Sequence, residues 1–250
     1  MSGHSKWHNI RLRKGKVDAQ RGALFTKLSK EIILAAKGGS PDPEANYRLK
    51  MAVDKARENN MPMDNIKRAI GRATGAEGAK EIEEVRYEGY GPHGVAVIVD
   101  AATDNRNRTA SEMRYVFSRN GGTLGETGSV AWQFEPRGLL EVLTAGRSED
   151  QLTELALVDG VEDLRYDSER SEIITGVTAL QPVRDALGAA GLKVSDARLC
   201  MEPKTTVALS GEEASAVLKF LDALEEHEDV QSVYSNVDLS GADLEALAGT

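Results

Sequence analysis

A chain of 250 residues is longer than one compact domain usually is, which predicts two or three domains of modest size. Hydrophobic residues make up 40% and charged residues 28%, a composition that excludes a disordered or fibrous protein. Cys200 is the only cysteine, so the sequence excludes an intrachain disulfide and fits a reducing compartment. Because no apolar stretch has the length of a signal peptide or of a membrane span, we expect a cytoplasmic protein without a membrane partner.

The net charge of −9 changes sign along the chain. Residues 1–80 hold seventeen Lys and Arg against eight Asp and Glu, a net charge of +9, which leaves −18 for residues 81–250. A basic segment attracts a polyanion, whereas an acidic segment repels one. Charge fluctuates along any long chain, but this basic excess coincides with a separate structural segment. We therefore expect residues 1–80 to bind nucleic acid.

The first 17 residues predict a flexible arm. No apolar period runs through them, and their side chains are suited to phosphate neutralisation and base stacking. The basic and aromatic residues of this arm are Lys6, Trp7, Arg11, Arg13, Lys14 and Lys16. A solvated tail is the alternative interpretation, although a tryptophan in a polar arm needs a packing partner.

Three short helices are expected after the arm. In the first, apolar residues between 24 and 36 share one face, Lys27, Lys30 and Lys37 lie opposite, and Gly38 with Gly39 ends the helix. Asp42 with Pro43 predicts the start of the second helix, and Asp64 predicts the N-cap of the third. The Gly-rich stretch 74–80 predicts a domain boundary. Residues 1–80 are thus interpreted as a basic arm and a helical domain.

From residue 81 the hydrophobic period changes to that of strands. Residues 85–90 and 95–99 predict a hairpin, followed by a helix that Asp104 or Asn105 caps and by a strand at 130–134. Residues 137–203 then predict the order βαββαβ, a ferredoxin-like pattern, and residues 205–234 predict strand, helix and strand.

These patterns predict an α+β fold of three domains. An N-terminal three-helix domain is followed by two α/β domains of ferredoxin-like type, the third inserted into the second. The expected domains are 1–80, 81–136 plus 204–240, and the inserted domain 137–203, with a tail at 241–250.

One glycine pattern imitates a dinucleotide-binding fingerprint. Gly89, Gly91 and Gly94 satisfy the spacing G-x-G-x-x-G, but that fingerprint requires a helix after the glycines, whereas residues 95–99 predict a strand. A hairpin turn explains the glycines better. The sequence also lacks the phosphate-binding motif G-x-x-x-x-G-K-[ST], so we expect no nucleotide cofactor.

Residue types that bind metals or act as nucleophiles form no recognisable site. His4 and His8 share the arm, and His93 and His227 stand alone in the sequence, so we interpret all four as solvated or RNA-facing. Cys200 is interpreted as a core residue of a strand. The sequence therefore favours a protein without enzymatic activity, cofactor or metal. An enzyme with its site across the α/β domains and a protein-interaction module with an acidic surface stay open as alternatives.

Several long motifs along nearly the whole chain closely resemble those of the YebC family. The N-terminal motifs are GHSKW (3–7), RG (21–22), FTKL (25–28), AVDKAR (52–57), NMP (60–62) and DNI (64–66). The later motifs are YEGYGP (87–92), TDNRNRT (103–109), GG (121–122) and LGETGSV (124–130).

The resemblance implies one helical and two α/β domains and no known catalytic activity. Members of the family have been labelled transcriptional regulators that bind DNA, whereas others act at the ribosome, including the mitochondrial translational activator of cytochrome oxidase. Bacterial relatives are associated with relief of stalling at proline-rich sequences.

The sequence favours a ribosome-associated translation factor, because the arm combines positive charge with a stacking residue. A DNA-binding transcriptional regulator is the alternative, in which helix 65–73 with Lys67, Arg68 and Arg72 enters a major groove. We expect a monomer that binds ribosomal RNA or DNA and no small-molecule substrate. The candidate nucleic-acid contacts are Lys6, Trp7, Arg11, Arg13, Lys14, Lys16, Arg21, Lys27, Lys30, Arg106 and Arg108.

Overall fold

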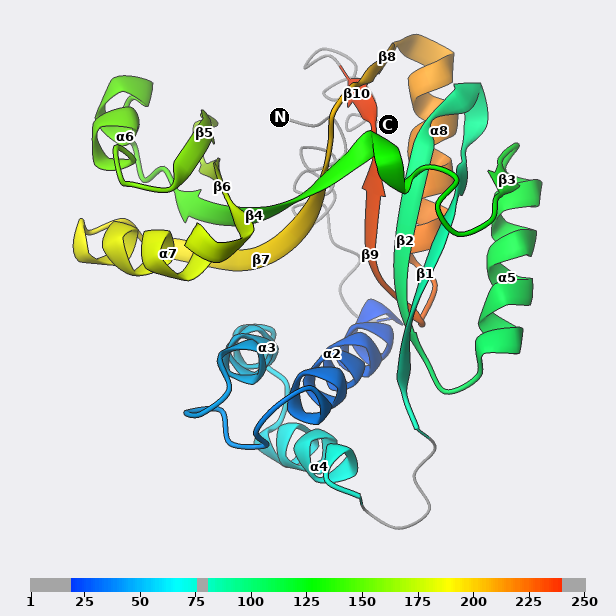
Figure 1. The fold of residues 1–250 in the computed structure, drawn as a ribbon, viewed down its shortest axis with the longest axis horizontal. Helices are drawn as coiled ribbons and strands as arrows, with labels where there is room; N and C mark the ends of the chain where they lie inside the picture. Colours follow the sequence, from blue (N-terminus) through cyan, green and yellow to red (C-terminus); the bar gives the residue numbers. More distant parts are fainter. Residues whose placement is uncertain (1–18, 76–80, 240–250) are drawn as a thin grey trace. The chain divides into compact units, whose positions relative to one another are not determined.

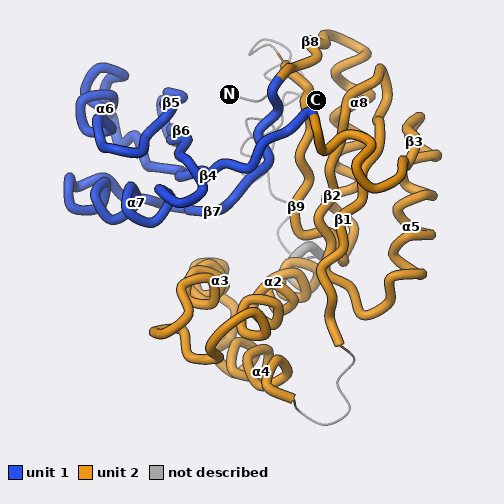
Figure 2. The backbone as a smooth tube through the Cα atoms, in the orientation of Figure 1, with its two compact units in different colours: residues 1, 133–204 blue, residues 2–132, 205–250 orange. Residues whose placement is uncertain are grey.

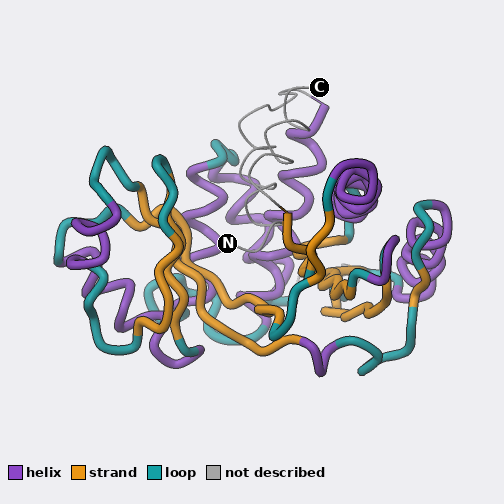
Figure 3. The backbone as a smooth tube through the Cα atoms, turned by 90° about the horizontal axis from the view of Figure 1, so that it is seen from above, coloured by secondary structure: helices purple, strands orange, loops and turns teal. Residues whose placement is uncertain are grey.

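The structure, a computed structural model, describes residues 19–75 and 81–239 and has an α+β fold (Figure 1). The chain divides into two compact units (Figure 2). The inserted unit comprises residues 133–204, and the main unit comprises the described residues before 133 and after 204. The described part of the chain consists of helices, strands and connecting loops (Figure 3). The three-helix segment and the α/β elements before residue 133 and after residue 204 belong to the same unit. The partition into three domains therefore stays a prediction.

The main unit begins with three helices, as the sequence predicts: α2 (Ala19–Lys37), α3 (Tyr47–Glu58) and α4 (Met63–Ala73). Their apolar stripes meet in one core that includes Leu28, Ile32, Leu49, Val53 and Ile66. This core also takes in Ile82 and Ala102 from the strand region, so the helices pack against the sheet of the same unit.

Two predicted helix starts are wrong. Asp42 caps a single turn, with its carboxylate accepting from Glu44 N at 3.0 Å, and α3 begins five residues later than Asp42. Asn46 is the true N-cap because its side chain accepts from Leu49 N and donates to the carbonyl of Ala35, 2.8 Å away. Asp64 lies inside the first turn of α4, where it stabilises the helix through the macrodipole rather than as a cap.

The predicted hairpin is confirmed. Strands β1 (Glu83–Tyr90) and β2 (Ala96–Thr103) are antiparallel, with Tyr90 opposite Ala96. The turn between them contains a short 3-10 helix (Pro92–Gly94), and the backbone is left-handed at His93 (φ 57°) and Gly94 (φ 76°). The glycines of this region therefore serve the turn and are followed by a strand.

The main sheet has the order β3-β1-β2-β9, with β3 at Thr123–Leu124 and β9 at Val230–Ser235. The expected helix after Asn105 is α5 (Arg106–Arg119), and α8 (Gly211–Glu225) supplies a second helix. Phe117 and Phe220 join the two helices in the core, with ring centroids 5.0 Å apart and an edge-to-face angle of 77°.

One strand prediction fails, and another is confirmed with an unexpected partner. Residues 131–133 form a 3-10 helix (Ala131–Gln133) rather than the middle of a strand at 130–134. The strand predicted at the start of residues 205–234 is β8 (Val207–Leu209). It pairs in parallel with β10 (Val237–Leu239), a strand that the sequence pattern did not predict, and not with the main sheet.

The inserted unit confirms the predicted order βαββαβ. Its sheet has the order β5-β6-β4-β7, and every neighbouring pair is antiparallel. The elements are β4 (Phe134–Leu143), α6 (Glu149–Leu155), β5 (Val161–Arg165), β6 (Arg170–Thr175), α7 (Leu180–Ala189) and β7 (Val194–Pro203). Cys200 on β7 is buried, as predicted, and this burial raises the pKa of its thiol to about 12.

No helix of the described part of the chain has both the length and the apolar composition needed to cross a membrane.

We predict opposite effects for alanine at two glycines of the main unit. A Cβ on buried Gly91 would lie 2.6 Å from the Phe220 ring, so Gly91→Ala should lower the free energy of unfolding by about 1–3 kcal/mol. Gly71 on α4 has open space around it, so Gly71→Ala should raise this free energy by up to about 1 kcal/mol. Urea denaturation followed by circular dichroism measures both, and equal effects would contradict the close approach at Gly91.

Candidate nucleic-acid interface

The cations of α3 and of the end of α2 have carboxylate partners. Each of these side chains forms an ion pair within the helical segment or with a glutamate at residues 81–84. Exposed pairs of this kind contribute little to stability, but they reduce the positive potential available to a polyanion. The pairs are Lys37–Glu81, Arg48–Glu84, Lys50–Glu44, Lys55–Glu31 and Arg57–Asp54.

Helix α4 differs from α2 and α3. Its cations Lys67, Arg68 and Arg72 are exposed, and within residues 19–75 and 81–239 none of them forms an ion pair. Arg68 only donates to the side-chain oxygen of Asn65, 3.4 Å away. Because Ile66 and Ala69 bury the opposite side of α4 in the core, the helix presents a fixed basic face. The basic face of α4, defined by these three cations, is the candidate interface.

Arg72 extends the basic face of α4 to a pocket. This hollow of about 300 Å³ lies between the helical segment and α5, and Lys30 and Arg108 also line it together with Asp104 and Glu228. The carboxylates balance much of the positive charge there.

Lys27 and Lys30 have acceptors inside the main unit. Lys27 donates to the backbone carbonyl of Glu225 at the end of α8. Lys30 donates to the Asp229 carboxylate and to the carbonyl of Glu228, 3.1 Å away. The predicted role of both lysines as phosphate contacts stays a prediction, but their visible role is to hold α2 against the end of α8.

Asp229 is the centre of this contact, and its side chain is 0% exposed. Besides Lys30, its carboxylate accepts from Arg108 Nη2 at 2.8 Å and from Thr109 Oγ1 at 2.6 Å. Burial opposes the charged carboxylate, but the hydrogen bonds from these three side chains outweigh it and hold the pKa of Asp229 well below its ordinary range. Asp229 is therefore an anion that joins α2, α5 and β9.

The other predicted contacts are placed differently. Arg106, at the start of α5, has a side chain 66% exposed and a distant partner in Glu83, 3.6 Å away. Arg108 donates to the buried Asp229, although 37% of its side chain is exposed. The predicted contacts of the arm (Lys6, Trp7, Arg11, Arg13, Lys14 and Lys16) lie outside the described residues, as does the side chain of Arg21.

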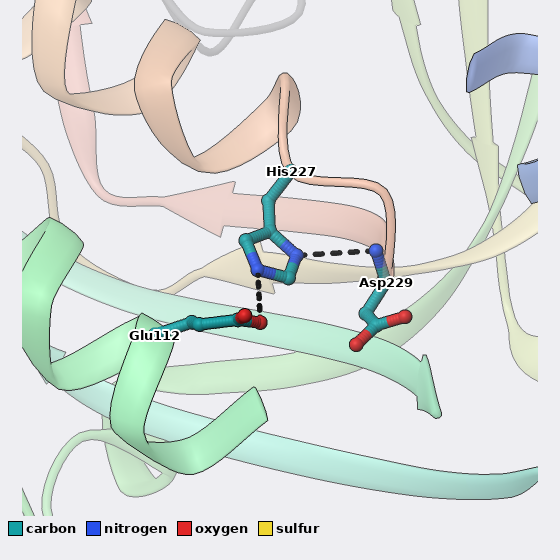
Figure 4. Close-up of side chains that lie close together, drawn as sticks. All are labelled: Glu112, His227 and Asp229. Carbon is teal, nitrogen blue, oxygen red and sulfur yellow. Dashed lines mark hydrogen bonds and ion pairs between the residues drawn. The ribbon is translucent and has the colours of Figure 1, made fainter. Parts of the chain in front are cut away.

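His227 is not the solvated or RNA-facing residue that the sequence suggests. Its ring lies between Glu112 and the backbone of Asp229 (Figure 4). Nδ1 accepts from Asp229 N at 3.1 Å, so the neutral ring carries its proton on Nε2, which donates to Glu112 Oε2 at 3.0 Å. No local sequence pattern indicates this pairing, because Glu112 lies 115 residues earlier.

Glu112, His227 and Asp229 offer ligand atoms within 4.8 Å of one another, but they do not fit a metal ion. Both ring nitrogens of His227 are hydrogen-bonded, and the Asp229 carboxylate is already neutralised by Lys30 and Arg108. A cation would have to displace these donors, so the cluster is a structural hydrogen-bond network.

The comparisons identify the protein family. Residues 5–76 match the family model described as "TACO1/YebC protein N-terminal domain", and residues 82–237 match "TACO1/YebC second and third domain". The chain belongs to the TACO1/YebC family.

Similar proteins carry a regulatory name. A "probable transcriptional regulatory protein" of Pelotomaculum thermopropionicum is 52% identical over 241 residues, covering 96% of this chain and 99% of the relative. One from Chlorobaculum tepidum with the same description is 50% identical over 248 residues, covering 99% of each. The crystal structure of the conserved hypothetical protein Aq1575 from Aquifex aeolicus is similar, with a TM-score of 0.84 and 46% identity over 90% of this chain and 93% of that one.

We predict that Asp229→Asn lowers the free energy of unfolding by about 3 kcal/mol, because the variant leaves Lys30 and Arg108 with an uncharged partner in a buried site. Glu228→Gln is the control, since this neighbouring side chain is exposed and its change should cost less than about 0.5 kcal/mol. Chemical denaturation measures both variants. Similar small losses in the two would show that the buried ion pairs do not hold the unit together.

The stabilisation from Asp229 should depend on pH. Its pKa is lowered in the folded state, so the stabilisation is complete above the unfolded pKa of about 4 and is lost as pH falls toward the folded pKa. The gap in unfolding free energy between the original chain and Asp229→Asn should therefore narrow between pH 7 and pH 3. A gap that stays constant or widens would contradict the buried anion.

Proposed function

We propose that the chain is a cytoplasmic, non-enzymatic regulator of gene expression that binds nucleic acid through the basic face of α4. One observation carries this proposal: Lys67, Arg68 and Arg72 are exposed and unpaired among the described residues, whereas the cations of α3 have carboxylate partners. A helix face whose three cations have no carboxylate partner among the described residues is suited to a row of phosphates.

The names of the similar proteins favour DNA as the target and a role in transcription. Helix α4 supports this target because Asn65, Arg68 and Arg72 are residue types that contact base edges and phosphates in a major groove. The buried side of α4 fixes the direction of these side chains before binding, which reduces the entropy lost on association.

A ribosome-associated translation factor that aids synthesis through proline-rich stalls is the second candidate. The family description joins the names TACO1 and YebC. The sequence resemblance includes relatives that act at the ribosome, which favours ribosomal RNA. The same basic face would then bind phosphates of an RNA helix, because phosphate contacts carry no sequence information.

We predict that the triple variant Lys67→Gln, Arg68→Gln, Arg72→Gln weakens binding and flattens its salt dependence. The slope of log affinity against log salt should fall by about 0.9 for each phosphate that the variant no longer neutralises on duplex DNA, or by about 0.7 on a single strand. Fluorescence anisotropy with a labelled duplex at several salt concentrations measures the slope.

The matched control for this experiment is Arg48→Gln, Lys50→Gln, Lys55→Gln. It removes the same charge, but each of these side chains is already paired with a carboxylate. Equal flattening in both variants would mean that total charge, and not the basic face of α4, determines affinity. An unchanged slope in the α4 variant would contradict the proposed interface directly.

A further inference from the structure

Helix α5 is a basic segment inside the acidic part of the chain. Its residues 106–119 include four arginines and one glutamate, a net charge of +3, whereas residues 81–250 as a whole carry −18. Without the helix, the rest of that part would carry −21. Such a local excess of positive charge either neutralises carboxylates of the fold or remains for a partner.

The four arginines of α5 divide between these two roles. Arg108 donates to the buried Asp229, and Arg106 has Glu83 as a partner, 3.6 Å away. Arg114 and Arg119 are exposed, and neither forms an ion pair within residues 19–75 and 81–239. Their charges are therefore not consumed by carboxylates of the described fold.

The exposed side of α5 carries no acidic residue. Glu112, the one acid of the helix, is half-buried and hydrogen-bonded to His227. The opposite side of the helix contributes Met113 and Phe117 to the core, which fixes the direction of the exposed side. We call the exposed residues that follow Arg106 the outer face of α5; they are Asn107, Ser111, Arg114, Tyr115, Ser118 and Arg119.

Arg119 is held in place by Tyr115, one helical turn earlier. Its guanidinium carbon lies 5.8 Å from the centre of the Tyr115 ring, and its Nη1 donates to Tyr115 Oη at 2.6 Å. An arginine held in this way loses less side-chain entropy when it binds a ligand. Arg114 precedes Arg119 by five residues, about 7.5 Å along the helix axis, so the two cations suit two separate phosphates.

The chemistry of the outer face favours a nucleic acid over a protein. Tyr115 is the one large hydrophobic side chain of α5 that is exposed, so the face lacks the apolar centre of a stable protein interface, which buries roughly 800 Å² on each side. Arginine, serine and asparagine are residue types that donate hydrogen bonds to phosphate oxygens.

We propose that the outer face of α5 is a second phosphate-binding surface of the main unit, in which Arg114 and Arg119 each contact one phosphate. The inference rests on the proposed function for the class of partner, but it does not depend on α4. Arg72 at the end of α4 and Arg108 at the start of α5 line the same hollow of about 300 Å³, so the two helices come together at these ends. One nucleic acid that extends beyond Arg72 is therefore expected to reach α5.

The double variant Arg114→Gln, Arg119→Gln of the full chain tests this inference. The slope of log affinity against log salt should fall by about 1.8 on a DNA duplex, or by about 1.4 on a single-stranded RNA, because two phosphate contacts are lost. Fluorescence anisotropy with both labelled probes measures the slope. Arg114→Lys with Arg119→Lys keeps both charges and should keep the slope.

The matched control is Arg86→Gln, Arg137→Gln. It removes the same charge, but Arg86 is paired with Asp100 at 2.7 Å and Arg137 with Glu135 at 2.9 Å. Its slope should change by less than half as much, and circular dichroism verifies that every variant is folded. Equal flattening in the control and in the α5 variant would overturn the second surface, since total charge would then explain both.

The outcomes separate this inference from the proposed function. If the α4 variant flattens the slope and the α5 variant does not, the second surface is wrong and the proposed function stands. If only the α5 variant flattens it, the second surface stands and the interface on α4 is wrong. Polyglutamate that displaces the labelled probes as well as an unlabelled duplex does would indicate an acidic protein and overturn the inference. If the original chain binds neither probe, both the proposed function and the second surface fail.

Discussion

The buried carboxylate of Asp229 joins the helical segment to the sheet of the main unit. An isolated carboxylate in such a place would be strongly unfavourable, but Lys30 from α2 and Arg108 from α5 supply two positive charges and Thr109 supplies a third donor. Asp229 lies just before β9, and His227 in the same loop contacts Glu112 of α5. Removing Asp229 would leave Lys30 and Arg108 without their anion, and removing either cation would take away one of the two ion pairs, so the helical segment and the α/β elements depend on each other.

This arrangement separates two groups of basic residues in the main unit. Lys27, Lys30 and Arg108 satisfy acceptors within the fold, whereas Lys67, Arg68 and Arg72 on α4 have no ion-pair partner among the described residues. Charge alone does not distinguish the two groups, because all six side chains are cations. The distinction comes from tertiary contacts, and it moves the candidate interface from α2 to α4.

Local patterns of the sequence were sufficient for much of the fold. Periodicity predicts the apolar face of α2, the β1–β2 hairpin and the βαββαβ order of the inserted unit, since each depends on neighbouring residues. The start of α3 was misplaced because Asp42 and Asn46 are both good caps, and hydrogen bonds from Asn46 to the carbonyls of Ala35 and Ser40 decide between them. The Lys30–Asp229 pair spans 199 residues, and no local pattern predicts it.

Crosslinking in living cells, followed by identification of both the attached nucleic acid and the modified peptides, tests most directly whether α4 binds nucleic acid. We expect nucleotide adducts on the peptides that carry α4, and the attached sequences distinguish genomic DNA from ribosomal RNA. Adducts confined to residues 133–204, or a chain recovered without nucleic acid, would contradict the proposed interface.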